Sequence, residues 1–239
     1  TTLADKSTTA GGSIKYQLFV HSNGTFTHND GTLKDTFDDT AHRWAIASGD
    51  SLYDVIIDNG SGITRLDTVD LDIANDLDVV EGTIRQHTTD GTGDITVDGD
   101  TTIEDGGTLG GNGDAGDYTF DKLIIESGGT YEATSGETGG LNHMTVSGTF
   151  THNSGSVTLD EGDVDKIAGA GTVTFYKLTG ATAGGGAQCR VQDITALVVQ
   201  HTLDVQTNFW LTAGAVDAPS VTIGTTSATG NLKLTSQAL

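Results

Sequence analysis

Apolar and acidic residues alternate along the segment "DLDIANDLDVV" (70–80). Its aliphatic residues lie at odd positions and its aspartates at even positions: Leu71, Ile73, Leu77 and Val79 against Asp70, Asp72, Asp76 and Asp78. Side chains of a β-strand alternate between two faces, so this parity places the aliphatic groups on one face and the carboxylates on the other. The stretch "GDITVDGDTTIEDGGTLGG" (93–111) repeats the pattern between Gly and Asp turns. Both segments predict short strands with one buried face.

A degenerate repeat runs through most of the chain. Gly-Thr followed by an apolar residue occurs at Gly24, Gly82, Gly107, Gly129, Gly148 and Gly171, with separations of 58, 25, 22, 19 and 23 residues. A second element, found at 52–62, 120–129 and 175–185, has an aromatic residue, an aliphatic residue three positions later and then a Gly-rich turn. Repeats of this length need neighbouring copies to cover their apolar face. We therefore predict an all-β fold, a single-chain parallel β-helix (β-solenoid) with about ten coils of ~20–25 residues.

The hexamer "GTFTHN" occurs at 24–29 and again at 148–153. We interpret the two copies as the same position in the coil, several turns apart. Phe26 and Phe150 are expected to point inward and the threonines outward, where their hydroxyl groups form a ladder. Asn29 and Asn153 are expected at a corner, because Asn tolerates left-handed φ.

Two segments are distinguished along the chain. Residues 1–20 are predicted to form an N-terminal arm that ends in the strand-like "SIKYQLFV" (13–20). This strand either caps the first coil or pairs with another subunit, and capping is the commoner arrangement. Residues 21–239 are assigned to the β-solenoid, although 32–50 and 181–220 depart from the repeat.

Composition and charge narrow the partners. The chain has 34 Gly, one Pro and many β-branched residues, which favour strands and turns over helices. Thirty-three acidic against 11 basic residues give a formal charge of -22, which repels nucleic acid and anionic membrane surfaces. No apolar run reaches the ~20 residues of a membrane span, so membrane insertion is not expected. Cys189 is the single cysteine, so an intramolecular disulfide is impossible.

The segments "VSGTFTHNSGSVTLD" (146–160) and "GTVTFYKLTG" (171–180) carry a resemblance. They resemble Gly/Thr-rich "SGTFTHNSG"-type β-solenoid repeats of microbial surface proteins and of phage fibre or spike proteins. The resemblance extends over most of residues 21–239. It implies a structural role outside the cell, at a cell surface or in a virion.

Carboxylate clusters are the first candidates for chemistry. Two groups are dense enough to supply an acid and a base: Asp98, Asp100, Glu104 and Asp105, and Asp160, Glu161, Asp163 and Asp165. Both lie in polar Gly-rich turns, which disfavour the apolar setting that a catalytic acid needs. Asp160, Asp163 and Asp165 are candidate ligands for calcium, although no EF-hand spacing occurs; no other cofactor is expected. A solvated acidic face is the more ordinary interpretation.

Other motifs give weaker signals. Polysaccharide lyases of solenoid fold need cationic side chains to bind polyuronate, and the basic residues are dispersed along this chain, with Arg43, Arg65, Arg85 and Arg190 far apart. The seven histidines show no metal-ligand spacing. The Gly-rich runs lack the Lys-Ser/Thr of a phosphate-binding loop, and Cys189 is expected to be buried or idle.

Aromatic residues are the candidates for ligand or subunit contact. Trp44, Tyr53 and Trp210 could stack on a sugar ring or seat a neighbouring subunit. The ordinary alternative is that each tryptophan plugs one end of the narrow core.

Three functions follow in order of preference. The first is a non-enzymatic structural protein that assembles into a fibre, filament, spike or surface layer, as a homo-oligomer through solenoid ends or the N-terminal strand. The second is an adhesin or receptor-binding module that recognises a glycan. The third is a polysaccharide-degrading β-helix enzyme.

Overall fold

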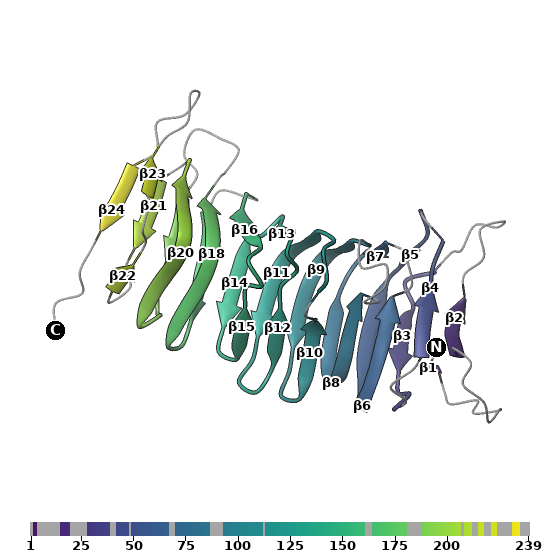
Figure 1. Cartoon of the computed structure of the whole chain (residues 1–239). Coiled ribbons are helices and arrows are strands. Elements are labelled where there is room, and N and C mark those ends of the chain that lie inside the picture. The colour runs from purple at the N-terminus through teal and green to yellow at the C-terminus, as the bar shows by residue number, and fades with distance from the viewer. Residues whose placement is uncertain are drawn as a thin grey trace.

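The computed structural model is a parallel β-solenoid, and Figure 1 shows its strands stacked side by side along one long axis. It describes residues 2–3, 15–19, 28–38, 42–47, 49–66, 70–86, 93–111, 113–160, 164–180, 188–206, 208–211, 215–217, 221–223 and 231–234. These residues form strands and turns and contain no helix. The described part of the chain therefore has no membrane-spanning helix. The prediction of an all-β parallel solenoid is confirmed.

Every paired strand is parallel to its neighbour, and the pairs form three ladders, A, B and C, that the chain visits in this order. Six long strands bend at a corner and serve two ladders each: β6 (Asp54–Leu66) and β8 (Leu77–Gln86) in A and B, β9 (Ile95–Ile103) and β11 (Tyr118–Ile125) in C and A, and β18 (Thr172–Gly180) and β20 (Ala196–Val205) in B and C.

The remaining strands belong to one ladder each. Ladder A is completed by β1 (Thr2–Leu3), β3 (Thr32–Asp35), β14 (His143–Val146), β17 (Val164–Gly169), β19 (Gln188–Val191), β21 (Asn208–Leu211) and β24 (Asn231–Leu234). Ladder B has β2 (Lys15–Phe19), β4 (His42–Ala45), β10 (Gly107–Gly110), β12 (Thr130–Glu132), β15 (Thr149–Thr151) and β22 (Ala215–Asp217). Ladder C has β5 (Ser51–Leu52), β7 (Leu71–Ile73), β13 (Glu137–Gly139), β16 (Ser156–Leu159) and β23 (Val221–Ile223).

The inward residues of ladder A trace the turns one by one. Their order is Leu33, Val55, Leu77, Thr101, Leu123, Met144, Ile167 and Val191. All eight are buried, so this part of the chain makes about seven turns, and strands β1, β21 and β24 continue the ladder beyond it. The number of coils expected from the sequence, about ten, is larger than the number of turns, about seven, that these eight residues trace.

The core is a narrow stack of aliphatic and aromatic side chains. Leu71, Ile73, Leu77 and Val79 are at most 1 % exposed, as their parity predicts. A run of rings continues the stack: Tyr118, Phe120, Tyr131, Phe150 and Phe175, with successive centroids 5.2–6.1 Å apart. Phe150 packs against the core as expected, whereas Phe26 lies outside the described residues.

The two "GTFTHN" segments end in the same turn. His28 Nδ1 accepts a hydrogen bond from the Asp30 backbone N–H (3.0 Å), and His152 Nδ1 accepts one from Ser154 (3.0 Å). Asn29 and Asn153 have φ of 50° and 44°, so the prediction of left-handed asparagines is confirmed. The position in the coil differs, however, because the first turn leads into ladder A and the second into ladder C.

The N-terminal strands already belong to the solenoid. Strand β1 pairs with β3, and β2 pairs with β4. Strand β2 therefore covers the edge of β4. The ladders begin before residue 21, within the segment predicted to be an N-terminal arm.

Candidate functional site: charged columns on the outer wall

Parallel stacking turns the repeat period into a spatial array. A residue in one coil lies beside its register partner in the next, at the ~4.8 Å spacing of neighbouring strands. On the outer side of ladder A the array is a single column, given in order by Thr32, Asp54, Asp76, Asp100, Lys122, His143, Lys166, Arg190 and Trp210. All nine side chains are partly exposed.

The first part of this column is acidic, and we call Asp54, Asp76 and Asp100 the acidic column. Asn75 Nδ2 donates to Asp54 Oδ1 (2.7 Å) and to Asp76 Oδ2 (3.2 Å). The backbone N–H of Asp100 donates to Asp76 Oδ1 (2.9 Å). These bonds hold three carboxylates on adjacent turns, where they repel one another.

The second part is basic, and we call Lys122, His143, Lys166 and Arg190 the basic column. Burial lowers the pKa of His143, and the nearby Lys166 and Lys122 lower it further. The Arg190 guanidinium bonds Gln188 Oε1 (2.7 Å from Nη2) and lies 5.1 Å from the centroid of the Trp210 ring. The two columns meet where Lys122 Nζ binds Asp100 Oδ2 (2.5 Å).

A further cationic array lies on the outer side of ladder B. Arg43, Arg65 and Arg85 are register partners on three consecutive turns. Burial lowers the pKa of Arg65, and the charges of Arg85 and Arg43 lower it further. The Nε atoms of Arg65 and Arg85 are buried and have no hydrogen-bond partner among the described residues.

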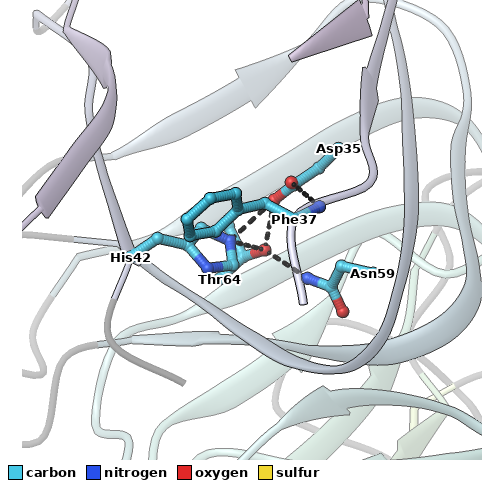
Figure 2. Close-up of polar contacts among 5 residues, drawn as sticks. All are labelled: Asp35, Phe37, His42, Asn59 and Thr64. Atoms are coloured by element: carbon cyan, nitrogen blue, oxygen red, sulfur yellow. Dashed lines mark hydrogen bonds and ion pairs between the residues drawn. The ribbon is translucent and has the colours of Figure 1, made fainter. Parts of the chain in front are cut away.

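A buried polar cluster, drawn in Figure 2, lies inside the first coils, where strands β3, β4 and β6 meet. His42 Nε2 lies 2.8 Å from Asp35 Oδ2 and 2.9 Å from Thr64 Oγ1. The Thr64 hydroxyl donates to Asp35 Oδ2 (2.6 Å), and the Asn59 amide lies 2.9 Å from Thr64 Oγ1. Rotating this amide by 180° would let its nitrogen donate to two carbonyl oxygens, but its oxygen would then need the one Thr64 proton that Asp35 accepts.

This cluster contains a carboxylate, an imidazole and a hydroxyl group, but it is not arranged for nucleophilic catalysis. In a nucleophilic triad the two ring nitrogens contact the acid and the nucleophile separately. Here the same atom, His42 Nε2, faces both Asp35 and Thr64, and the three side chains are 0 % exposed. The Phe37 ring also packs edge-on against His42 (5.1 Å). The cluster therefore has a structural role: its hydrogen bonds connect strands β3, β4 and β6 inside the first coils.

The three aromatic candidates lie in different environments. Trp44 is 0 % exposed and belongs to the hydrophobic core, in agreement with the alternative that tryptophan fills the core. Its ring is therefore not on a binding surface in this structure. Tyr53 is partly exposed and stacks on His28, with centroids 5.2 Å apart. Trp210 is partly exposed beside Arg190. The structure does not bring Tyr53 and Trp210 together, because they lie in coils near opposite ends of the ladder.

The carboxylates predicted for calcium do not converge in the described residues. Asp160 is exposed and accepts a hydrogen bond from the Gly140 backbone N–H (2.9 Å). Asp165 is 0 % exposed and lies inside the solenoid wall, and Asp163 lies outside the described residues. No group of three or more His, Cys, Asp or Glu within the described ranges is arranged to hold a metal ion. A calcium site stays a prediction.

Exposed rings line the corner between ladders B and C. The rings of His152, Tyr176 and His201 lie next to one another on consecutive turns, with interplanar angles of 32° and 31° and centroids 5.8 and 5.0 Å apart. These residues are 24 and 25 positions apart, about one coil length, and this spacing is the sequence signal that links them.

The basic columns, which were not expected from the sequence, have the same kind of spacing. Lys122, His143, Lys166 and Arg190 are separated by 21, 23 and 24 residues, and Arg43, Arg65 and Arg85 by 22 and 20. These separations equal the coil length. Residues that look dispersed along the chain are therefore neighbours in space, and comparing each basic residue with the repeat period would have found both arrays.

Comparison with known proteins gives no relative. No protein family matches this sequence, and neither a curated protein nor a solved structure matches it significantly.

Proposed function

We propose that this protein is a non-enzymatic structural module that assembles end to end with copies of itself, at a cell surface, in an extracellular filament or in a virion. The observation that carries the proposal is the open ladder. Among the described strands, β1 pairs only with β3, and β24 pairs only with β21.

A strand with one partner leaves a row of backbone N–H and C=O groups that another chain can pair with. Among the described strands, the first and last of ladder A, β1 and β24, have such rows and lie toward opposite ends of the stack (Figure 1). Strand β24 of one copy can thus pair with the N-terminal strands of the next, and repetition of this head-to-tail contact gives a filament. The resemblance to surface and fibre repeats supports the location.

Negative-stain microscopy of the purified chain over a range of concentrations tests this function. Filaments or end-to-end oligomers are expected, and particles one molecule long at every concentration would refute the proposal. Proline scanning of the free edge sharpens the test, because Pro removes a backbone donor. Successive N–H groups of a strand point to opposite sides, so Lys233→Pro and Leu234→Pro remove donors on different edges of β24.

One of the two proline variants is expected to abolish filaments without changing the melting temperature, and the other to destabilise the terminal coil. The alanine variants Lys233→Ala and Leu234→Ala are the matched controls. Filaments that persist in both proline variants would show that β24 is not the joining strand.

Glycan binding is the second candidate, and the row formed by His152, Tyr176 and His201 favours it. Partly or fully exposed rings in a row along one corner offer flat faces of the kind that stack on sugar rings. A glycan array with the wild type, Tyr176→Ala and the control Thr151→Ala decides this. Loss of binding in Tyr176→Ala alone supports it, and no binding by the wild type eliminates it.

A further inference from the structure

The outer face of ladder A is acidic in its first half and basic in its second half. When a second copy is turned end for end, its basic half therefore lies opposite the acidic half of the first copy. Three carboxylates, Asp54, Asp76 and Asp100, are followed by the basic column. The chain carries 33 acidic and 11 basic residues, so four consecutive outward positions with Lys, His, Lys and Arg on this face are a marked departure from the composition.

We infer that two copies of this protein associate side by side and antiparallel through ladder A, with the acidic column of each copy facing the basic column of the other. This rests on the proposed function in that both require copies to associate, but it concerns the side of the rod rather than its ends.

The register follows from the charges. In a face-to-face pair, a two-fold axis that crosses the column between Asp100 and Lys122 reverses its order. Asp100 then faces Lys122 of the second copy, and Asp54 faces Lys166, which gives ion pairs. Asp76 faces the His143 imidazole, which can donate a hydrogen bond to it. Each contact occurs twice in such an isologous interface.

Neighbouring registers are worse. Moving the axis by half a coil spacing places Lys122 opposite Lys122 of the second copy, or Asp100 opposite Asp100, and both contacts are repulsive. Moving it by a whole spacing places Lys122 opposite His143, or Asp76 opposite Asp100. A parallel arrangement without stagger places every charge opposite its like. The order of charges therefore selects the antiparallel pair and its register.

The adjacent outward column of ladder A is compatible with this packing. It runs Ile56, Asp78, Thr102, Ile124, Thr145 and Ala168, and all of these residues except Ala168 are partly exposed. The same axis places Ile56 opposite Ala168 of the second copy, and Thr102 opposite Ile124. Apolar and small groups thus supply the contact area that exposed ion pairs, each worth about 0–1 kcal/mol, lack.

The pKa shifts of two residues on this face are consistent with the pairing. Burial and the surrounding carboxylates of Asp76, Glu104, Asp54 and Asp100 raise the pKa of Asp78. The Lys166 and Lys122 charges help to lower the pKa of His143. Part of each shift therefore comes from neighbouring like charges, and an antiparallel partner places opposite charges beside both halves of the face.

The first test is sedimentation velocity of the full chain at 50 and 500 mM NaCl. A dimer is expected at low salt, with a dissociation constant about tenfold or more higher at 500 mM, because screening shortens the Debye length to a few ångströms. A monomer at all concentrations in low salt would overturn the inference.

Charge reversal provides the decisive test. In Asp54→Lys the introduced ammonium group faces Lys166 of the second copy, and in Lys166→Glu the introduced carboxylate faces Asp54, so each variant alone is expected to be monomeric. Mixing the two variants restores opposite charges at both contacts, and a heterodimer with wild-type affinity is expected. This rescue also shows that both variants are folded.

Two control variants match the changes in net charge. Glu132→Lys lies on the outer side of ladder B and, like Asp54→Lys, changes the charge from -22 to -20. Lys177→Glu is exposed on ladder C and, like Lys166→Glu, gives -24. Both are expected to dimerise as the wild type does; dimers in all four single variants, or no heterodimer on mixing, would refute the antiparallel interface.

Filaments distinguish the two proposals. If the charge-reversal variants dimerise unchanged while the β24 prolines abolish filaments, the lateral interface is wrong and end-to-end assembly stands. If the wild type forms salt-sensitive dimers but no filaments, the proposed function fails and the lateral interface stands.

Discussion

At the scale of single residues, the corners of the coil have the strictest requirements. Gly82 begins the ladder B part of β8, just after the corner, with φ of +90°, which L side chains rarely adopt. A Cβ atom at this position would lie 1.7 Å from Asn59 Oδ1 and 2.9 Å from the Gly60 carbonyl oxygen. Gly82 therefore lets the chain pass close to the buried polar cluster.

Gly82→Ala is expected to lower the free energy of unfolding by about 3 kcal/mol, because it combines left-handed strain of about 1–2 kcal/mol with displacement of Asn59. Gly49→Ala is the control, since Gly49 has nearly the same φ (+87°) but nothing within 4 Å of its Cβ position. Urea denaturation monitored by circular dichroism gives both values. Equal losses would show that strain alone matters and that the contact with Asn59 does not.

Asp114 is a buried carboxyl group whose ionisation is altered by the fold. It is 1 % exposed, and burial raises its pKa to about 6, although Tyr118 Oη and the Gln86 backbone N–H each donate a hydrogen bond to Oδ2. A carboxyl group whose folded pKa is raised stabilises the fold below its unfolded pKa of about 4, and this contribution is lost as the pH rises through about 6.

Asp114→Asn removes the buried charge but keeps an acceptor oxygen for Tyr118 and Gln86. The difference in melting temperature, variant minus wild type, is expected to be more positive at pH 8 than at pH 4.5. Thermal melts in matched buffers measure it. A difference that does not change with pH would mean that Asp114 does not titrate in this range.

At the scale of elements, turn conformation and position in the coil have separate origins. The residues of "THN" and the glycine two positions later set the turn, because the His side chain accepts a backbone bond and Asn adopts left-handed φ. These local contacts do not determine which ladder the following strand joins, because the same turn leads into ladder A in one case and ladder C in the other. The sequence therefore predicts the turn correctly but not the ladder, which depends on how the whole preceding coil is distributed over three faces.

Asn153→Ala tests the turn. Asn153 has φ of 44°, and its Nδ2 donates to the Ala133 carbonyl oxygen of the preceding coil (2.9 Å). Losing this bond and the tolerance for left-handed φ is expected to lower the free energy of unfolding by about 1–2 kcal/mol. Thr151→Ala, an exposed change in the same segment, is expected to have little effect in the same denaturation assay. A similar loss in both variants would contradict the role assigned to Asn153.

At the scale of the whole molecule, like charges accumulate on adjacent turns. Burial raises the pKa of Asp72, and Asp70, Asp98 and Asp94 raise it further. The net charge of -22 acts in the same direction, because repulsion between carboxylates opposes the compact state.

The wild type is therefore expected to melt at a higher temperature at pH 5 than at pH 8, since carboxyl groups with raised pKa gain protons in the folded state first. Added NaCl is expected to raise the melting temperature at pH 8 and to have less effect at pH 5, because fewer charges remain to be screened. Differential scanning calorimetry at two salt concentrations checks both. A melting temperature that rises with pH would mean that ion pairs, and not repulsion, dominate the electrostatics.

Prediction from sequence succeeded where the pattern is local and repeated. The parity of residues 70–79 correctly gave the buried face, and the spacing of the Gly-Thr pairs gave the solenoid. The charged columns escaped because they require the repeat period to be applied to residue types other than Gly and Thr. The placement of Trp44 in the core depends on the path of residues 32–50, which do not follow the repeat.

The register of ladder A also determines how such a protein can change length. Lys122 pairs with His143, so loss of 122–142 would leave His143 in the place of Lys122, with the strands on either side still in line. Each turn contacts its immediate neighbours, so whole turns can be gained or lost while the cross-section is conserved. Duplication of a gene segment that encodes about 22 residues would therefore lengthen the rod by one step, whereas an insertion of half that size would have to leave the wall as a loop.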